Sequence, residues 1–169
     1  MVEVDETFIG GKEKNKHACK KKGRLPAKSV VIGAVQREDR KVIAAHVPNT
    51  KAMTLKSYIY DNVKMGSQVM TDDNLGYRHL RWGYQHNAVK HSLGEYVKND
   101  VHTNSIESFW AVFKRGYIGI YHYMSKKHLH RFLDEYTFRY NHRNSDKVEQ
   151  ALANIKHRLT YKQLTKKVS

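Results

Sequence analysis

The sequence predicts one α/β domain in which a mixed five-stranded sheet is flanked by helices. Three observations support this fold class. Hydrophobic residues make up 40% of the 169 residues and aromatic residues 11%, which is enough to form a packed core. Stretches rich in β-branched residues come first in the chain, and amphipathic helical patterns come last. Strand and helix signals alternate between them, which is typical of parallel strands joined by helical crossovers.

The first part of the chain predicts three strands that pair as an antiparallel meander. Val2–Gly10 alternates in polarity and ends in a glycine turn, and Ser29–Val35 is rich in β-branched residues. A polar turn then leads to a third strand at Lys41–Val47. The intervening segment Lys12–Lys28 is rich in lysine and nearly lacks large apolar side chains, so we expect a long basic loop. Whether this loop is merely solvated or contacts a ligand stays open.

Helix and strand signals alternate in the middle of the chain. Pro48–Thr50 favours a helix N-terminus with Asn49 or Thr50 as the cap, and apolar residues repeat at helical spacing until Gly66. A fourth strand, a short helix and a fifth strand are expected next, at Ser67–Thr71, Tyr77–Trp82 and Tyr84–His91.

The last part of the chain predicts two amphipathic helices. The polar segment Gly94–Thr103 is expected to be a mobile loop, and a helix begins after it at Asn104 or Ser105. A final helix begins near Ser125. Each helix has one apolar face. These faces consist of Ile106, Phe109, Trp110 and Phe113 in the first helix, and of Leu129, Phe132, Leu133, Tyr136 and Tyr140 in the second. We therefore expect a domain at residues 1–145, followed by a basic helical tail at 146–169.

The charge balance indicates a polyanionic partner. Lys and Arg number 31 against 16 Asp and Glu, giving a formal charge of +15. Each cation placed on a phosphate releases condensed counterions, so nucleic acid is the expected partner class. No apolar run is long enough to span a membrane, and the N-terminus has no features of a secretory signal. The lone Cys19 excludes a four-cysteine zinc module and suits a reducing cytoplasm.

Three acidic residues lie in hydrophobic surroundings. The element order is that of the ribonuclease-H-like fold, in which the first and fourth strands are parallel neighbours. Asp5 on the first strand and Asp72 at the end of the fourth would then lie side by side, and Glu107 lies at the start of the aromatic-rich helix that begins at Asn104 or Ser105. Carboxylates from distant segments suit Mg²⁺ or Mn²⁺, and two such ions can promote phosphodiester displacement. Taken singly, each residue could instead serve as a turn or cap residue, and Asp73 is a register rival of Asp72.

Lys114 follows Glu107 by seven residues, which is two turns of the same helix face. The separation of about 10 Å is too long for an ordinary ion pair within a helix. It fits a lysine that contacts a phosphate beside bound metals, although a solvated lysine is also compatible. His102 and His122 flank this helix and are our candidates for positioning DNA.

Several ordered motifs resemble those of the DDE transposases of bacterial insertion sequences, in the group related to the Merlin transposons. The matching strings are VDETFIGGK at 4–12, TD at 71–72, HTNSIESFWAVFKRG at 102–116, GIYH at 119–122 and FRYNHR at 138–143. The resemblance extends over about residues 2–144. It implies an enzyme that cleaves and joins DNA at transposon ends, with two Mg²⁺ or Mn²⁺ ions as cofactors.

The resemblance also implies residue roles. Asp5, Asp72 and Glu107 match the acidic triad, and Lys114 with Arg115 would hold phosphates. Asn104, one turn before Glu107, is a further DNA contact and the fallback third ligand. The expected partners are transposon ends, target DNA and at least a second copy of the chain, and the expected location is the bacterial nucleoid.

The sequence departs from the group at its N-terminus. Members of the group usually have a zinc ribbon ahead of the catalytic domain, and one cysteine cannot form it. A truncated element, a degenerate element and a core that recognises ends by other means all stay open. The alternative functions are a domesticated, non-catalytic DNA-binding protein and a nuclease of the same fold that cleaves without joining.

Overall fold

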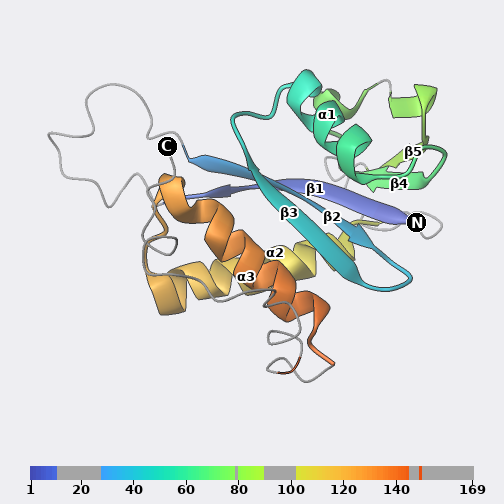
Figure 1. Cartoon of the computed structure of the whole chain (residues 1–169). Helices are drawn as coiled ribbons and strands as arrows, with labels where there is room; N and C mark the ends of the chain where they lie inside the picture. The colour runs from blue at the N-terminus through green and yellow to red at the C-terminus, as the bar shows by residue number, and fades with distance from the viewer. Residues whose placement is uncertain (11–27, 79, 90–101, 145–148, 150–169) are drawn as a thin grey trace, which may run out of the picture.

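A mixed five-stranded sheet forms the centre of the molecule (Figure 1). The computed structural model describes residues 1–10, 28–78, 80–89, 102–144 and 149. The strand order is β3-β2-β1-β4-β5. The strands are β1 (Val2–Ile9), β2 (Ser29–Gln36), β3 (Lys41–Val47), β4 (Gln68–Thr71) and β5 (Gln85–Ala88). β1, β2 and β3 form the expected antiparallel meander, and β4 lies parallel to both β1 and β5. The predicted fold class is therefore confirmed.

Helices cover both faces of the sheet (Figure 1). One face carries α1 (Ala52–Asn62), and the other carries α2 (Asn104–Gly116) and α3 (Leu129–Asn141). β2 serves both layers because its side chains alternate between them: Ile32 packs into the α1 core, and Val31 into the α2 and α3 core. Burial on both faces explains why this strand is a continuous hydrophobic run.

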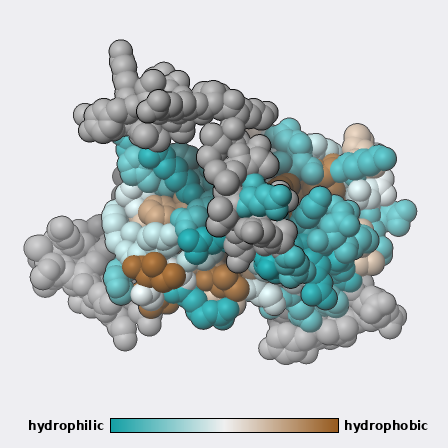
Figure 2. Space-filling model, turned by 60° about the horizontal axis from the view of Figure 1, so that its bottom comes forward, coloured by the Kyte–Doolittle hydropathy of each residue, from teal (hydrophilic) through white to brown (hydrophobic). Residues whose placement is uncertain are grey.

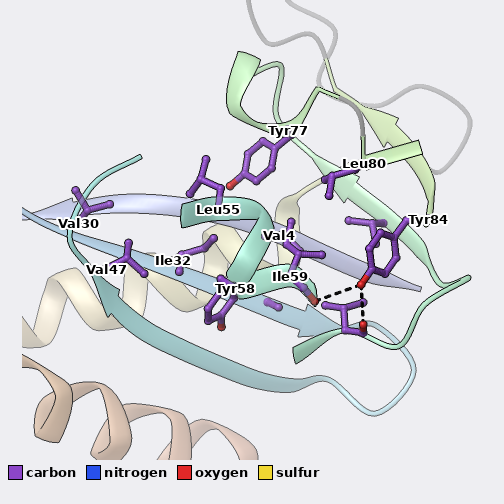
Figure 3. Packing of buried hydrophobic residues seen from close by; sticks show 13 residues of the cluster. Val4, Val30, Ile32, Val47, Leu55, Tyr58, Ile59, Tyr77, Leu80 and Tyr84 are labelled. Carbon is purple, nitrogen blue, oxygen red and sulfur yellow. Dashed lines mark hydrogen bonds between the residues drawn. The ribbon is translucent and has the colours of Figure 1, made fainter. Parts of the chain in front are cut away.

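The core under α1 also contains tyrosines whose hydroxyls reach backbone acceptors (Figure 3). The Tyr84 hydroxyl donates to the Val63 carbonyl at 2.9 Å, and the Tyr58 hydroxyl donates to the Ile43 carbonyl at 3.1 Å. These bonds give the tyrosine hydroxyls hydrogen-bond partners inside the apolar core. Figure 2 shows the molecule with the bottom of Figure 1 turned forward, and its coloured surface is mainly hydrophilic with a few hydrophobic patches.

The local elements differ from the sequence expectations in five places. Asn49 and Thr50 do not cap α1. Its N-cap is Lys51, whose side chain has no acceptor for a cap bond, and the Asn49 side chain accepts from the Lys51 amide and the Thr54 hydroxyl. The expected short helix is two 3₁₀ turns, the fifth strand is shorter than predicted, and a 3₁₀ turn precedes α3. The bounds of these turns are Leu75–Tyr77, Leu80–Trp82 and Lys126–His128. A π-helical turn at Tyr117–Tyr121 continues α2.

Several predictions concern residues outside the described part of the chain. They are the basic loop up to residue 27, Cys19, the polar loop up to residue 101, and the tail apart from Glu149. Within the described residues, no helix combines the length and the apolar character needed to cross a membrane.

Candidate active site

Strand pairing brings Asp5 and Asp72 together. β1 and β4 run parallel with Val2 opposite Val69 and Glu3 opposite Met70. Continued by two residues, this register brings Asp5 level with Asp72, directly after the end of β4. Carboxylate oxygens of Asp5, Asp72 and Glu6 lie within 4.8 Å of one another, and all three residues are half-buried. The proximity expected from the topology is thus confirmed, and Glu6 joins the group.

The electrostatic environment of Asp5 is unfavourable for a negative charge. Burial is the main cause that raises the pKa of its carboxyl group, from 3.8 to about 7, and the charges of Asp72, Glu6 and Glu107 raise it further. The contribution of Glu107 places that residue within electrostatic range of the pair. A cation bound among these oxygens would remove the repulsion.

Glu107 lies in the first turn of α2 and is exposed. Its Oε1 accepts a hydrogen bond of 2.8 Å from the hydroxyl of Thr103, the N-cap residue of the helix. Among the described residues, the close group of potential metal ligands contains Glu6 and does not include Glu107. Glu107 therefore lies near the aspartate pair but outside the 4.8 Å group in this conformation.

Glu6 was not singled out from the sequence, and its contacts explain why it lies at the site. The side-chain amide of Asn74 donates to Oε1 of Glu6, and the hydroxyl of the fully buried Tyr77 donates to Oε2. The backbone amide of Asn74 donates to Oδ1 of Asp72 at 3.1 Å. The segment after β4 is therefore attached to β1 beside Asp5. The acidic pair Asp5-Glu6 is the only sequence signal that could have indicated this.

Glu3 is a second acidic residue that the sequence reasoning missed. Its side chain is fully buried, and its Oε2 accepts from the backbone amides of Ser105 at 2.8 Å and Ile106 at 3.1 Å, at the start of α2. Its Oε1 pairs with Nε of Arg37 at 2.6 Å. A carboxylate at a helix N-terminus satisfies amides that have no partner within the helix. Glu3 thus joins β1 to the helix that carries Glu107.

Comparison with known proteins decides the family. The sequence profile of the ISXO2-like transposase domain matches residues 1–141. The chain belongs to this family of DDE transposases. Its fold is similar to that of the catalytic core domain of BIV integrase, with a TM-score of 0.55 and 11% sequence identity, and the match covers 90% of this chain and 93% of that one. No curated protein matches the chain.

The transposase is accordingly a polynucleotidyl transferase with a ribonuclease-H-like fold, of a class that binds DNA and uses divalent metal. The other residues expected at its site lie around α2. Lys114 and Arg115 are exposed in the last turn, Asn104 is exposed at the first residue, and His122 is exposed with a left-handed φ of 54°. His102 is half-buried: its carbonyl accepts from Nη2 of Arg37, and its Nδ1 lies 3.4 Å from Oε1 of Glu3.

Proposed function

We propose that this transposase cleaves DNA strands at transposon ends and joins the freed 3′ ends to target DNA, with Asp5, Asp72 and Glu107 as the residues that hold two Mg²⁺ or Mn²⁺ ions. The observation that carries the proposal is the convergence of Asp5 and Asp72 on neighbouring parallel strands, with Glu107 close enough to raise the pKa of Asp5. The three residues come from segments far apart in the sequence and meet in a strongly basic protein.

The donor set fits a hard divalent cation. All three side chains offer carboxylate oxygens, which Mg²⁺ and Mn²⁺ prefer as ligands. Burial is the main cause of the raised pKa of Asp5, and the neighbouring carboxylates add a repulsion that divalent charge would relieve. When bound, the ions would supply charge neutralisation of the scissile phosphate and activation of the attacking hydroxyl group.

The chain's own residues would bind and orient the DNA around this centre. Lys114 and Arg115 would hold phosphates, because both are exposed at the far end of the helix that begins near Asp5. Exposed Asn104 and His122 would contact the DNA as well. His102 would act there mainly through the fixed position of its backbone, since Arg37 holds its carbonyl.

The proposal extends to assembly and location. Joining two transposon ends in one reaction requires both ends to be held together, so we expect a homodimer or a higher assembly on DNA. The expected location is the nucleoid of a bacterial cell.

Plasmid nicking tests the assignment of the three acidic residues. Purified protein is incubated with supercoiled plasmid in Mg²⁺ or Mn²⁺, alongside Asp72→Asn and Glu107→Gln. The neighbouring exposed Asp73→Asn serves as the matched control, because it removes the same charge one residue away. Both test variants should lose nicking while retaining DNA binding, and the control should nick like the wild type. Nicking that survives in Asp72→Asn and is lost in Asp73→Asn would contradict the assignment.

A second assay addresses joining. Pre-cleaved duplexes that end in the transposon's terminal sequence are incubated with a target plasmid, and insertion is scored by gel. Metal-dependent insertion that requires Glu107 is the expected result. Nicking without any insertion would contradict the joining step of the proposal.

A further inference from the structure

We propose that the two glutamates beside Asp5 on β1 are positioning residues, each of which fixes another acidic residue relative to Asp5. Glu3 would fix the helix that carries Glu107, and Glu6 would fix the segment that carries Asp72. The inference rests on the proposed function of the three acidic residues and deepens it, because it identifies what sets their mutual geometry.

The role of Glu3 follows from its place on the strand. Side chains two residues apart in a strand point to the same face, so Glu3 and Asp5 both face the layer that contains α2. The Glu3 carboxylate accepts from the amides of Ser105 and Ile106, and Glu107 follows within the same turn. The start of α2 is therefore bound to the strand two residues from Asp5.

Arg37 completes the attachment of α2. Its Nε donates to Glu3 at 2.6 Å, and its Nη2 donates to the carbonyl of His102 at 2.7 Å, just before the helix. The Glu3 carboxylate is fully buried, is matched by a cation and accepts two helix amides. These partners hold it as an anchor, and a charge-assisted network of this kind has a well-defined geometry.

Glu6 has the corresponding role on the opposite face of β1. Each of its two oxygens accepts from a different donor, Oε1 from the amide of Asn74 and Oε2 from the hydroxyl of Tyr77. Tyr77 is fully buried, so the position of its hydroxyl is fixed by the core. Asn74 donates from its backbone to Asp72 and from its side chain to Glu6, and it thereby couples the two carboxylates.

The expected consequence is a change in metal affinity. Mg²⁺ requires near-ideal octahedral geometry, so small displacements of its ligands matter. Residues that orient metal ligands typically change metal affinity by about 10- to 100-fold when they are replaced. Loss of either anchor should therefore weaken metal binding without removing a ligand.

The test uses Glu3→Gln and Tyr77→Phe, each compared with the wild type. Glutamine keeps one acceptor oxygen but loses the charge that pairs with Arg37. Phenylalanine removes one hydroxyl and leaves the Glu6 carboxylate intact. Tyr58→Phe is the matched control, because it removes a tyrosine hydrogen bond to the carbonyl of Ile43 on β3, a strand that β2 separates from β1.

Calorimetric titration of the DNA-free protein with Mn²⁺ measures the effect, after circular dichroism has shown each variant to be folded. We expect the Kd for Mn²⁺ to rise about 10- to 100-fold in Glu3→Gln and Tyr77→Phe and to stay unchanged in Tyr58→Phe. Amide hydrogen exchange should accelerate at Ser105 and Ile106 in Glu3→Gln alone. A general loss of stability would not produce this pattern.

Asp72→Asn distinguishes a failure of the proposed metal site from a failure of the positioning roles of Glu3 and Glu6. If Asp72→Asn abolishes Mn²⁺ binding, the metal site stands, and an unchanged Kd in Glu3→Gln or Tyr77→Phe overturns the role of the corresponding glutamate. Tighter binding in Tyr77→Phe also overturns the role of Glu6, because it would mean that the released carboxylate is itself a ligand. Mn²⁺ binding that does not depend on Asp72 overturns the proposed function and the anchors together.

Discussion

Replacement of Asp5 by asparagine tests the electrostatic state of the metal-free site. Burial, followed by the charges of Asp72, Glu6 and Glu107, raises the pKa of Asp5 from 3.8 to about 7. A group whose pKa is raised by folding destabilises the folded protein once it must ionise. The penalty is absent well below pH 4, where Asp5 is protonated in both states; it grows between about pH 4 and pH 7 and is complete above pH 7.

The structure sets the size of the expected effect. A displacement of about three pKa units corresponds to roughly 4 kcal/mol at 1.36 kcal/mol per unit. Asp5 is only half-buried, so solvent screens part of its charge, and we expect Asp5→Asn to raise the free energy of unfolding by about 2–4 kcal/mol at pH 8. At pH 5 the gain should fall to less than half of that value, because folded Asp5 is then largely protonated.

Urea denaturation in EDTA, followed by circular dichroism at pH 5 and pH 8, measures both values. Asp39→Asn is the control: Asp39 is exposed in the turn between β2 and β3, and its replacement should change stability by less than about 0.5 kcal/mol. Saturating Mg²⁺ should stabilise the wild type, because a ligand that binds only the folded state raises the free energy of unfolding. The difference in stability between Asp5→Asn and the wild type should therefore become smaller. Equal or lower stability of Asp5→Asn at pH 8 without metal would refute the reasoning.

The remaining predictions concern packing and DNA binding. In Gly116→Ala the new Cβ would lie 1.5 Å from the Tyr136 hydroxyl, so the Tyr136 ring or the helix that carries it must shift, and denaturation should show a loss of about 1–3 kcal/mol. Phe109→Ala empties a fully buried position and should lose about 3–5 kcal/mol in the same assay. Lys114→Ala should weaken DNA binding and reduce the slope of log K against log salt by about 1 in fluorescence anisotropy, and an unchanged slope would argue against a phosphate contact.

The fold could be predicted because its main elements have strong local patterns. The run Ser29–Val35 is buried on both faces of the sheet, and such a strand needs no partner information to be recognised. The apolar stripe of α2, including Phe109 and Phe113, packs in the core as its helical spacing predicts. The proximity of Asp5 and Asp72 followed from topology alone, and the distances between their carboxylate oxygens confirm it.

The contacts that define the site could not be predicted in the same way. Alternation places Glu3 and Glu6 on opposite faces of β1, but their partners Ser105 and Asn74 lie more than 60 residues away in sequence. The N-cap of α1 was also predicted wrongly, because the Asn49 side chain forms hydrogen bonds with Lys51 and Thr54 and does not cap the helix. The catalytic roles of Asp72 and Glu107 stay predictions, because contacts alone do not test them.

The three carboxylates on β1 differ in their surroundings. Glu3 is matched by Arg37 and two helix amides, and Glu6 is matched by two neutral donors, so both are held by protein groups. Asp5, between them, has the raised pKa that burial and like charges impose. Ionisation is thereby least favourable at Asp5, which we propose as a ligand of the cation. Since phosphates would be repelled by the same charge, DNA should bind beside Asp5 far better with divalent metal than without it.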